Sequence, residues 1–453
     1  MDIALPRAVR FLLDTLHRNN HKAYIIGGCV RDAVLGMPVH DYDITTSAHP
    51  ALVQELFQKE GIPVIPTGLK HGTITLRIDH ENYEVTTFRT EKDYRDHRTP
   101  NEVAFAATLL EDVKRRDFTI NTLAYNEEEG LLDLVKGLED LNKRIIRCVG
   151  NPDERFEEDA LRILRALRFT MSLRFTIEPD TWSALQRHAS LLTYISAERI
   201  RDEWNRMLMS EYDEILDLLY DSGVMDIVFP ELSKLHHRKQ HSLWHPYDMF
   251  QHTQLALQHT SGYTLAEKLA VVFHDIGKPD TMYLDEHQHG HFPHHAKVST
   301  ELTMQIMKRL KYDHATTQTV CRLIACHDSY LQPNERFMRR FLGKLEGDYS
   351  LCRSIIKVQL ADDHAKDPKR AEEKIDILIR CQRIADELER QHPALTLSNL
   401  AVDGNDLKAM GLTGVQIGKG LKSILQEVIE GTIHNTKEDC LTYIKKHVLN
   451  GTL

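Results

Sequence analysis

The sequence predicts an α+β head at the N-terminus followed by all-α regions, so that the protein as a whole is mainly α. Two patterns lead to this fold class. Residues 72–78 and 82–89 alternate apolar and polar side chains, as strands do, whereas segments after about residue 150 repeat apolar residues at helical spacing. A chain of 453 residues is also long enough for several domains.

Changes of pattern along the chain suggest four domains. We expect the head over residues 1–145, a helical neck over 146–235, a histidine-rich domain over 236–370 and a helical tail over 371–453. No internal repeat or low-complexity stretch interrupts this order.

The composition is that of an ordinary globular protein, with 42% hydrophobic and 27% charged residues. No apolar run approaches the ~20 residues of a membrane span, and the N-terminus lacks the plan of a signal peptide. Seven scattered cysteines without a C-x-x-C pair favour reduced thiols and a cytoplasmic location. The net charge of −10 argues weakly against a nucleic-acid partner but does not exclude a local basic groove.

The most informative segment, residues 27–44, reads as a glycine turn after a strand, then a helix and a second strand. Asp41 and Asp43 are two residues apart on that strand, so both carboxylates would face the same way and could share a magnesium ion. Gly28 opens the helix, where bare backbone can approach phosphates, and Arg31 lies one turn further. Each piece alone is also typical of an ordinary turn or a solvated strand end.

In this order the motifs GG-x-x-RD, LG and D-x-D resemble the polymerase-beta superfamily, and within it the class II tRNA nucleotidyltransferases, or CCA-adding enzymes. The resemblance covers nearly the whole chain and is most specific over residues 24–169. It implies CTP and ATP as substrates, tRNA as partner and Mg²⁺ as cofactor. It also implies that Asp41 and Asp43 bind the magnesium, with Glu84 as a third catalytic carboxylate.

Residues 90–101, TEKDYRDHRTPN, are charged and lack apolar periodicity, which predicts a mobile loop. Members of the resembled family that add only CC have this loop shortened. Its presence therefore argues against a CC-only enzyme.

The segment 114–125, KRRDFTINTLAY, predicts two arginines that open a helix, with Asp117 and Asn121 on one polar face. A capped surface helix explains the same pattern. The resemblance assigns Arg116, Asp117 and Asn121 to contacts with ribose and triphosphate. Thr122 stands where alanine is expected, a small departure.

The segment 157–169 carries Asp159 and Arg162, which would be neighbours on one helix. A carboxylate only accepts hydrogen bonds and a guanidinium only donates them, so this pair fits the edges of cytosine and adenine and leaves unpaired groups against uracil and guanine. A solvated face with a salt bridge from Glu158 to Arg162 is the alternative. The family's E-D-x-x-R motif, a protein template for the incoming base, matches here. Two arginines expected to support the phosphates or the neck continue the ridge: Arg165 and Arg168.

Metal-ligand residue types are frequent in the histidine-rich domain. The expected ligands are His252, His274, Asp275 and Asp362, with His295 and His327 as further candidates. The His-Asp pair before Gly-Lys-Pro resembles the HD phosphohydrolase superfamily, which implies a divalent transition metal such as nickel, manganese or cobalt. His294 stands where relatives carry glycine, so the choice between His294 and His295 stays open, as does that between Asp362 and Asp363. A core or exposed histidine cluster is the alternative.

The tail segment 400–435 resembles the tRNA-binding C-terminus of the same nucleotidyltransferases. Lys419 and Lys422 could meet phosphates there, although a plain helical cap explains the pattern equally well. Three readings besides CCA addition stay open: an enzyme that adds only A or makes poly(A), a phosphodiesterase or phosphatase of the HD type, and a non-catalytic tRNA-binding module. The intact acidic residues argue against the last reading.

Overall fold

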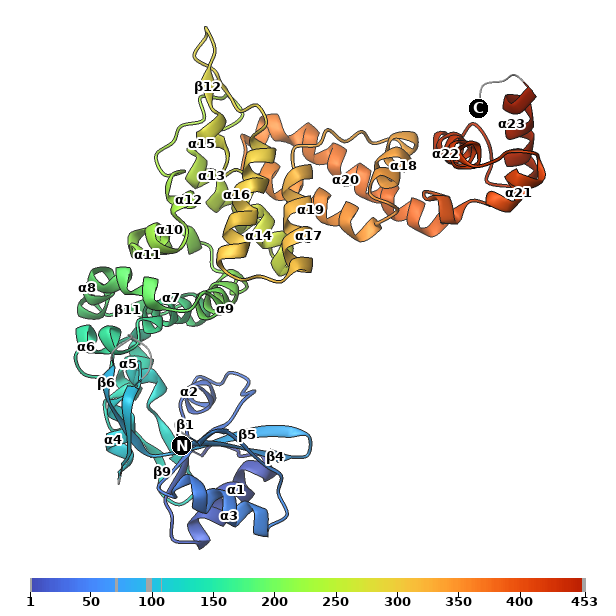
Figure 1. The fold of residues 1–453 in the computed structure, drawn as a ribbon. Helices are drawn as coiled ribbons and strands as arrows, with labels where there is room; N and C mark the ends of the chain where they lie inside the picture. The colour runs from blue at the N-terminus through green and yellow to red at the C-terminus, as the bar shows by residue number, and fades with distance from the viewer. Residues whose placement is uncertain (1, 70–71, 95–99, 107, 450–453) are drawn as a thin grey trace. The chain divides into compact units, whose positions relative to one another are not determined.

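The computed structural model describes residues 2–69, 72–94, 100–106 and 108–449. The chain divides into two compact units, Met1–Pro230 and Glu231–Leu453, here called unit 1 and unit 2 (Figure 1). The expected α+β head followed by helical regions is confirmed. Head and neck fall together in unit 1, and the finer division into four domains stays a prediction.

Unit 1 contains a seven-stranded sheet with the order β3-β4-β5-β2-β1-β8-β9. Among these neighbours only β2 and β5 run parallel. The strands are β1 Ala23–Ile26, β2 Asp43–Thr46, β3 Val64–Gly68, β4 Thr73–Ile78, β5 Glu81–Thr87, β8 Ala124–Asn126 and β9 Gly130–Leu132. The hairpin expected over residues 72–89 is therefore present as β4 and β5. β1 is apolar throughout and fully buried, which suits a central strand.

Helices surround this sheet and then form the neck. Figure 1 shows α1 and α3 together on one side of the sheet. The helices of unit 1 are α1 Arg7–Arg18, α2 Gly28–Val34, α3 Pro50–Lys59, α4 Leu109–Lys114, α5 Gly137–Lys143, α6 Pro152–Glu158, α7 Leu161–Leu173, α8 Pro179–His188, α9 Ala197–Leu208, α10 Ile215–Asp221 and α11 Val224–Val228. Three-residue and six-residue 3₁₀ helices lie at Thr119–Asn121 and Ala189–Tyr194, and β10 Ile145–Ile146 pairs in parallel with β11 Thr176–Ile177.

The segment 90–101 differs from the expected loop. Both ends of the segment are part of an antiparallel ribbon, β6 Arg89–Tyr94 with β7 Pro100–Phe105, in which Arg89 pairs with Phe105. The residues of these strands show no apolar alternation, so local pattern carries no strand signal, whereas the structure defines the ribbon by backbone pairing between the two strands. Residues 95–99 lie outside the described residues.

Unit 2 is helical apart from a short hairpin of β12 Tyr283–Leu284 and β13 Gly290–His291. Its helices, with α12 spanning the boundary, are α12 Pro230–Ser233, α13 Met249–Gln258, α14 Leu265–Phe273, α15 Lys278–Thr281, α16 His295–Arg309, α17 His314–Cys326, α18 Glu335–Lys344, α19 Tyr349–His364, α20 Pro368–Gln391, α21 Gly404–Ala409, α22 Val415–Glu430 and α23 Lys437–Leu449. The last three helices share a core around Leu407, Ile424 and Ile444.

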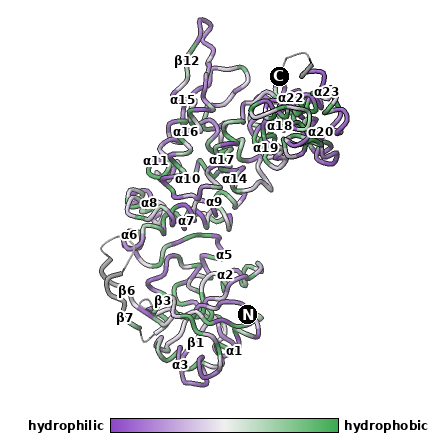
Figure 2. Tube along the Cα trace, turned by 45° about the vertical axis from the view of Figure 1, so that its right-hand side comes forward, coloured by the Kyte–Doolittle hydropathy of each residue, from purple (hydrophilic) through white to green (hydrophobic). Residues whose placement is uncertain are grey.

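Local sequence explains how these helices begin and why they pack. Thr264 starts α14 with a capping box that Glu267 completes. In the tube of Figure 2, hydrophobic and hydrophilic residues alternate along the helices, as amphipathic helices around a core require. Within the described part of the chain, no helix has both the length and the apolar character to cross a membrane.

Candidate active site and metal centre

The glycine turn between β1 and α2 forms one wall of the head site. Gly27 has φ = 88°, a conformation that favours glycine, and its amide donates to the Leu123 carbonyl oxygen at 3.1 Å. A Cβ added at Gly27 would lie 3.6 Å from Nη1 of Arg116. The turn therefore brings bare backbone close to a guanidinium group.

Three carboxylates lie near the start of β2. Asp43 begins the strand and is in register with Glu84 on the parallel neighbour β5, whereas Asp41 precedes the strand, contrary to the expected strand position. Desolvation raises the pKa of Asp43, opposed by Arg116 and assisted by Asp41. Desolvation also raises the pKa of Glu84, with further contributions from Asp43 and Asp41. Negative charge thus accumulates at this edge of the sheet.

A hydrogen-bond network joins several of the expected nucleotide-binding residues. Arg31 Nη1 donates to Asn121 Oδ1 at 2.7 Å, and Asn121 Nδ2 donates to Asp117 Oδ1 at 3.2 Å. Arg165 Nη2 lies 2.5 Å from Asp117 Oδ2. Burial alone would raise the pKa of Asp117, but Arg165 holds it at about 2. The arginines expected to open a helix at this point instead follow α4, which ends at Lys114.

Phe169 on α7 lies beneath three guanidinium groups. The centres of these groups are 5.1 Å from the ring centroid for Arg31, 5.4 Å for Arg165 and 4.1 Å for Arg168. Phe118 packs edge-on against the same ring, with centroids 5.8 Å apart. One aromatic ring therefore connects the arginine of the head to two arginines of the neck.

Asp159 and Arg162 do not share a continuous helix, contrary to the expectation. α6 ends at Glu158 and α7 begins at Leu161, and Asp159 between them has an extended backbone. Asp159 accepts from Arg199 at 3.0 Å. Arg162 donates to Glu158 at 2.8 Å, the salt bridge named as the alternative, and its Nη2 donates to a backbone carbonyl oxygen at 2.8 Å. The backbone turn is what separates the two side chains.

In unit 2, four ligand-type residues from three helical segments meet in one buried cluster. One ligand atom of each lies within 4.8 Å of the others, for His252, His274, Asp275 and Asp362. His252 Nε2 is 2.8 Å from Asp362 Oδ1, and His274 Nε2 is 3.2 Å from Asp275 Oδ2. All the residues expected as primary ligands therefore converge.

A second group shares Asp275 with the first. The second group consists of this aspartate with His295 and His327. The Nε2 atoms of the two histidines are 3.1 Å apart and lie 3.6 and 3.8 Å, respectively, from Asp275 Oδ1. His295, not His294, thus reaches the cluster. Gly277 permits this approach, since a Cβ there would lie 2.8 Å from the His295 carbonyl oxygen.

The imidazoles are oriented by the backbone. Nδ1 of each ring lies next to a carbonyl oxygen, at 2.7 Å for His274 and His327, 2.9 Å for His295 and 3.3 Å for His252. A ring that donates from Nδ1 presents the Nε2 lone pair to the cluster, which is the usual second-shell arrangement around metal-binding histidines.

Buried carboxylates of this cluster attract positive charge. Burial would raise the pKa of Asp275, yet His274 and Lys278 hold it well below its usual range. Burial would lower the pKa of His274, but Asp275 and Asp362 raise it to about 10. Asp363 instead pairs with Lys366 at 2.6 Å, outside the cluster. The carboxylate oxygens of Asp275 and Asp362 that face the cluster are suitable ligands for a cation.

The described residues contain two groups of three or more metal-type ligands this close together, and both are in unit 2. Asp41, Asp43 and Glu84 do not together form such a group.

Three family models match separate parts of the chain. Residues 23–147 match the Poly A polymerase head domain, residues 174–235 match the "Probable RNA and SrmB- binding site of polymerase A", and residues 290–444 match tRNA nucleotidyltransferase domain 2. The last model includes His295, His327 and Asp362 but not His252, His274 or Asp275, and none of the three descriptions names a phosphohydrolase.

Curated relatives are similar to this chain over about half of its length. The CCA-adding enzyme of Lactiplantibacillus plantarum is 48% identical over 207 residues, which cover 46% of this chain and 50% of that protein. The CCA-adding enzyme of Lactobacillus helveticus is 51% identical over 196 residues, 43% of this chain and 48% of that protein. The chain thus spans about half the length of the curated relatives it matches.

Solved structures match over the full length. The Bacillus stearothermophilus CCA-adding enzyme in complex with CTP is 27% identical, covers 99% of both chains and has a TM-score of 0.72. This chain is similar to CCA-adding enzymes in sequence over part of its length and in fold over nearly all of it. The Thermotoga maritima CCA-adding enzyme complexed with tRNA shares the fold, with 18% identity, a TM-score of 0.60 and coverage of 98% and 97%.

Sequence reasoning missed three residues that contact the expected site. Arg199 pairs with Asp159, and Glu203 accepts from Arg168 at 2.6 Å. Arg199 and Glu203 are four residues apart on α9 and therefore lie on the same face of that helix. This spacing could have been recognised in the sequence. Phe169 is the last residue of the segment 157–169, and no local pattern reveals its role, because that role depends on contacts with arginines, one of them distant in sequence.

Proposed function

We propose that this chain adds C, C and A to the 3′ ends of tRNA from CTP and ATP, without a nucleic-acid template and with release of pyrophosphate. The observation that carries the proposal is the match in fold over 99% of both chains to a CCA-adding enzyme solved with CTP. The match to the Poly A polymerase head domain over residues 23–147 supports the same chemistry.

Mg²⁺ is the cofactor we propose for the head, held by Asp41 and Asp43 with Glu84 as the third carboxylate. The raised pKa values of Asp43 and Glu84 support this fit: burial is the main cause of both shifts and the neighbouring carboxylates add to it, and a divalent cation would offset both. When bound, the ion would stabilise charge on the attacking and leaving oxygens of the phosphoryl transfer. The carboxylates orient the site; the guanidinium groups nearby neutralise the triphosphate.

The nucleotide would lie along the arginine network. We propose contacts from the backbone of Gly28 and from Arg31, Arg116 and Asn121, with Arg165 and Arg168 supporting the phosphates. Asp117 then acts by holding Arg165 and Asn121 in place, since both contact its carboxylate. Asp159 supplies the acceptor for the exocyclic amino group of cytosine or adenine, and Arg162 or Arg199 supplies the donor.

Product sequencing tests the proposal directly. tRNA lacking its 3′ end and tRNA ending in CC are each incubated with one nucleoside triphosphate or with CTP and ATP together. We expect two C residues and one A, in that order. Addition of A alone would support the A-adding reading, and long A tracts would support a poly(A) polymerase; either result overturns the proposal.

A second activity is favoured by the buried His/Asp cluster. We propose that His252, His274, Asp275 and Asp362 bind a divalent transition metal, with His295 and His327 completing a two-metal site that hydrolyses phosphate esters or 2′,3′-cyclic phosphates. Neutral imidazole nitrogen and carboxylate oxygen are suitable ligands for such ions. A bound ion would lower the pKa of its water. Asp275 belongs to both ligand groups, so the same residues would be able to hold a second ion.

Metal analysis separates this activity from nucleotide addition. Wild type, His274→Ala and the matched control His259→Ala, outside the cluster, are loaded with nickel, manganese or cobalt and assayed for hydrolysis. We expect His274→Ala alone to lose metal and hydrolysis while it retains nucleotide addition. A wild-type protein that binds no metal would leave only the transferase.

We also propose that the protein is cytoplasmic and that it is divided into the four domains expected from the sequence. All seven cysteines are free, most of them buried, which supports a reducing compartment. The separate core of the last three helices supports a distinct tail. Expression of residues 371–453 alone would test that boundary.

A further inference from the structure

We propose that Lys278 competes with a divalent metal ion for Asp275 and thereby sets how tightly the His/Asp cluster of unit 2 binds metal. Nζ of Lys278 lies 2.6 Å from Oδ2 of Asp275. The same oxygen faces Nε2 of His274 at 3.2 Å and Nε2 of His252 at 3.6 Å. The inference rests on the proposed second activity for the presence of a metal, but it concerns the affinity for that metal and not hydrolysis.

The ligand atoms around this lysine fit a metal ion better than they fit an ammonium group. Among the described residues, both carboxylate oxygens of Asp275 and Nε2 of His274 are buried without a hydrogen-bond partner in suitable geometry. Buried polar atoms left unpaired cost free energy, and a cation that accepts lone pairs from several directions would satisfy all three. Lys278 reaches Oδ2 by distance and charge alone, so it leaves this requirement open.

Charge is the second observation. Lysines match the carboxylates of this region one for one: Lys278 with Asp275, Lys366 with Asp362 and Asp363, and Lys374 with Asp363. With neutral imidazoles, three negative charges minus three positive charges leave no surplus to attract a divalent ion. Of these lysines, Lys278 contacts the carboxylate that both ligand groups share. Its ammonium therefore opposes a metal ion most directly.

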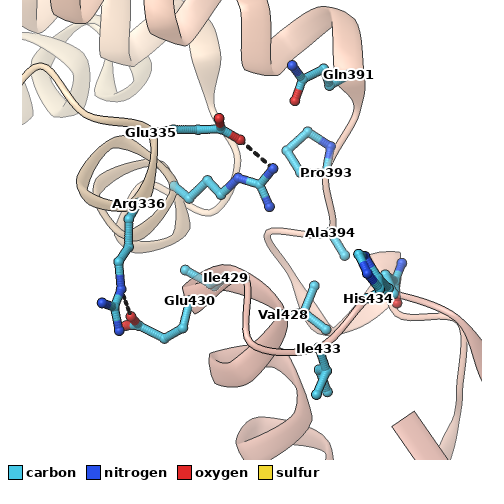
Figure 3. Close-up of a pocket in the computed structure, with 13 residues that line it drawn as sticks. Glu335, Arg336, Gln391, Pro393, Ala394, Val428, Ile429, Glu430, Ile433 and His434 are labelled. Atoms are coloured by element: carbon cyan, nitrogen blue, oxygen red, sulfur yellow. Dashed lines mark hydrogen bonds and ion pairs between the residues drawn. The ribbon is translucent and has the colours of Figure 1, made fainter. Parts of the chain in front are cut away.

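Burial makes this opposition strong. The side chains of Lys278 and Asp275 are only 6% and 1% exposed. Arg336 and Glu430, which line the cavity of Figure 3, form an ion pair in which the arginine side chain is 60% exposed, so water and salt screen it. Screening is much weaker at the buried pair, and so is the screening of repulsion between the ammonium and a metal ion on the same oxygen.

Lys278 has other partners close by, which makes the competition reversible. Its Nζ donates to Oε1 of Gln240 at 2.9 Å and lies 5.2 Å from the ring centroid of Phe292. A carbonyl oxygen and an aromatic face both stabilise an ammonium group. A metal ion that takes Oδ2 of Asp275 thus displaces Lys278 toward contacts that it already makes, without unfolding the segment.

Removal of the ammonium tests the proposal. Full-length wild type and Lys278→Met are treated with a chelator, and the Kd for nickel, manganese or cobalt alone is measured by titration calorimetry at pH 7. We expect the Kd of Lys278→Met to fall about tenfold or more, because a like charge leaves a buried site. Lys278→Arg keeps the charge and should bind metal as weakly as wild type.

Lys357→Met is the matched control. Nζ of Lys357 pairs with the buried Glu267 at 3.1 Å in the same unit, outside the cluster, so its loss should leave the Kd for metal unchanged. Thermal scans supply a second readout. Lys278→Met should have a lower Tm than wild type in chelator, and metal should raise its Tm by more than it raises that of wild type. A lysine with a structural role alone would lower the Tm without tightening metal binding.

Each outcome decides the proposal. An unchanged or higher Kd in Lys278→Met, an equal fall in the control, or a fall of the same size in Lys278→Arg would overturn it. Should Lys278→Met fail to fold, Lys278→Gln replaces it. If the variant binds metal more tightly but neither protein hydrolyses phosphate esters, the proposed second activity fails and this inference stands. If neither protein binds metal, both fail.

Discussion

At the scale of single residues, the buried and charged form of Asp43 in the head lowers the stability of the folded protein. Because the pKa of Asp43 is raised, the folded metal-free protein binds a proton more readily than the unfolded chain. Linkage then requires that stability decrease as pH rises from the ordinary pKa through the raised one. A cation at the site would relieve this cost at neutral pH.

We therefore expect Asp43→Asn to lower nucleotide addition on the order of 100-fold or more, since it removes a metal ligand, yet to raise the Tm of the chelator-treated protein at pH 7. The Tm difference from wild type should shrink as pH falls below the ordinary aspartate pKa. Thermal scans with a chelator from pH 3 to 8 measure it, with exposed Asp14→Asn as control. A Tm that drops at pH 7 would contradict the electrostatic argument.

Phe169 gives a second prediction at this scale. Its ring face holds Arg31, Arg165 and Arg168, which would otherwise repel one another. Phe169→Leu keeps an apolar side chain but removes the π face, and each cation–π contact is worth about 0.5–1 kcal/mol. The KM for CTP and ATP should rise on the order of tenfold with a smaller change in kcat, and Phe169→Tyr should restore it. Equal losses in both variants would indicate a packing role alone.

At the scale of elements, the break between α6 and α7 decides which guanidinium can read a base. Arg199 contacts Asp159 directly, whereas Arg162 is tied to Glu158 and to backbone carbonyl oxygens. The acceptor of the proposed template is thus paired with a residue of α9.

Separate Arg162→Ala and Arg199→Ala variants distinguish the two guanidinium groups. We expect the variant that removes the base-reading donor to lose discrimination of CTP and ATP against UTP and GTP by more than it loses rate, because the acceptor–donor pattern is gone. Incorporation ratios with mixed nucleotides supply the readout, and Asp159→Ala serves as the reference. If all three variants discriminate like wild type, these residues form helix contacts only.

The β6–β7 ribbon gives another prediction for an element. Among the described residues β6 and β7 form a two-stranded sheet separate from the seven-stranded one, so removal of the ribbon should leave the main sheet intact. Deleting residues 91–103 should preserve addition of the two cytidines but reduce addition of the terminal adenosine, because a segment beside the site can help to reshape it for the larger base. Primer-extension gels resolve the two steps. Equal loss of C and A would assign the ribbon a general structural role.

At the scale of the whole molecule, the two compact units predict two responses to ligands. A ligand that binds one folded unit raises the stability of that unit alone. We expect CTP with Mg²⁺ to raise one unfolding transition and nickel to raise another, with His274→Ala abolishing only the nickel response. Differential scanning calorimetry measures both. A single transition that both ligands raise would mean that the units unfold cooperatively.

The sequence by itself determined what depends on local pattern. Strand alternation and helical spacing gave the α+β head and the helical remainder, and the residue types of the His/Asp cluster were identified together because ligand chemistry restricts them to histidine and carboxylate. The D-x-D pair and its glycine turn were likewise visible as short motifs.

Tertiary structure alone decided what depends on contacts between distant residues. The helix break at Asp159 reassigned its partner from Arg162 to Arg199, 40 positions away. The choice of His295 over His294 followed from the packing of α16 against Gly277, and the convergence of three arginines on Phe169 from head and neck helices that meet only after folding. Local pattern records which side chains are available; which of them meet is fixed by backbone turns and by packing between segments that the chain brings together from far apart.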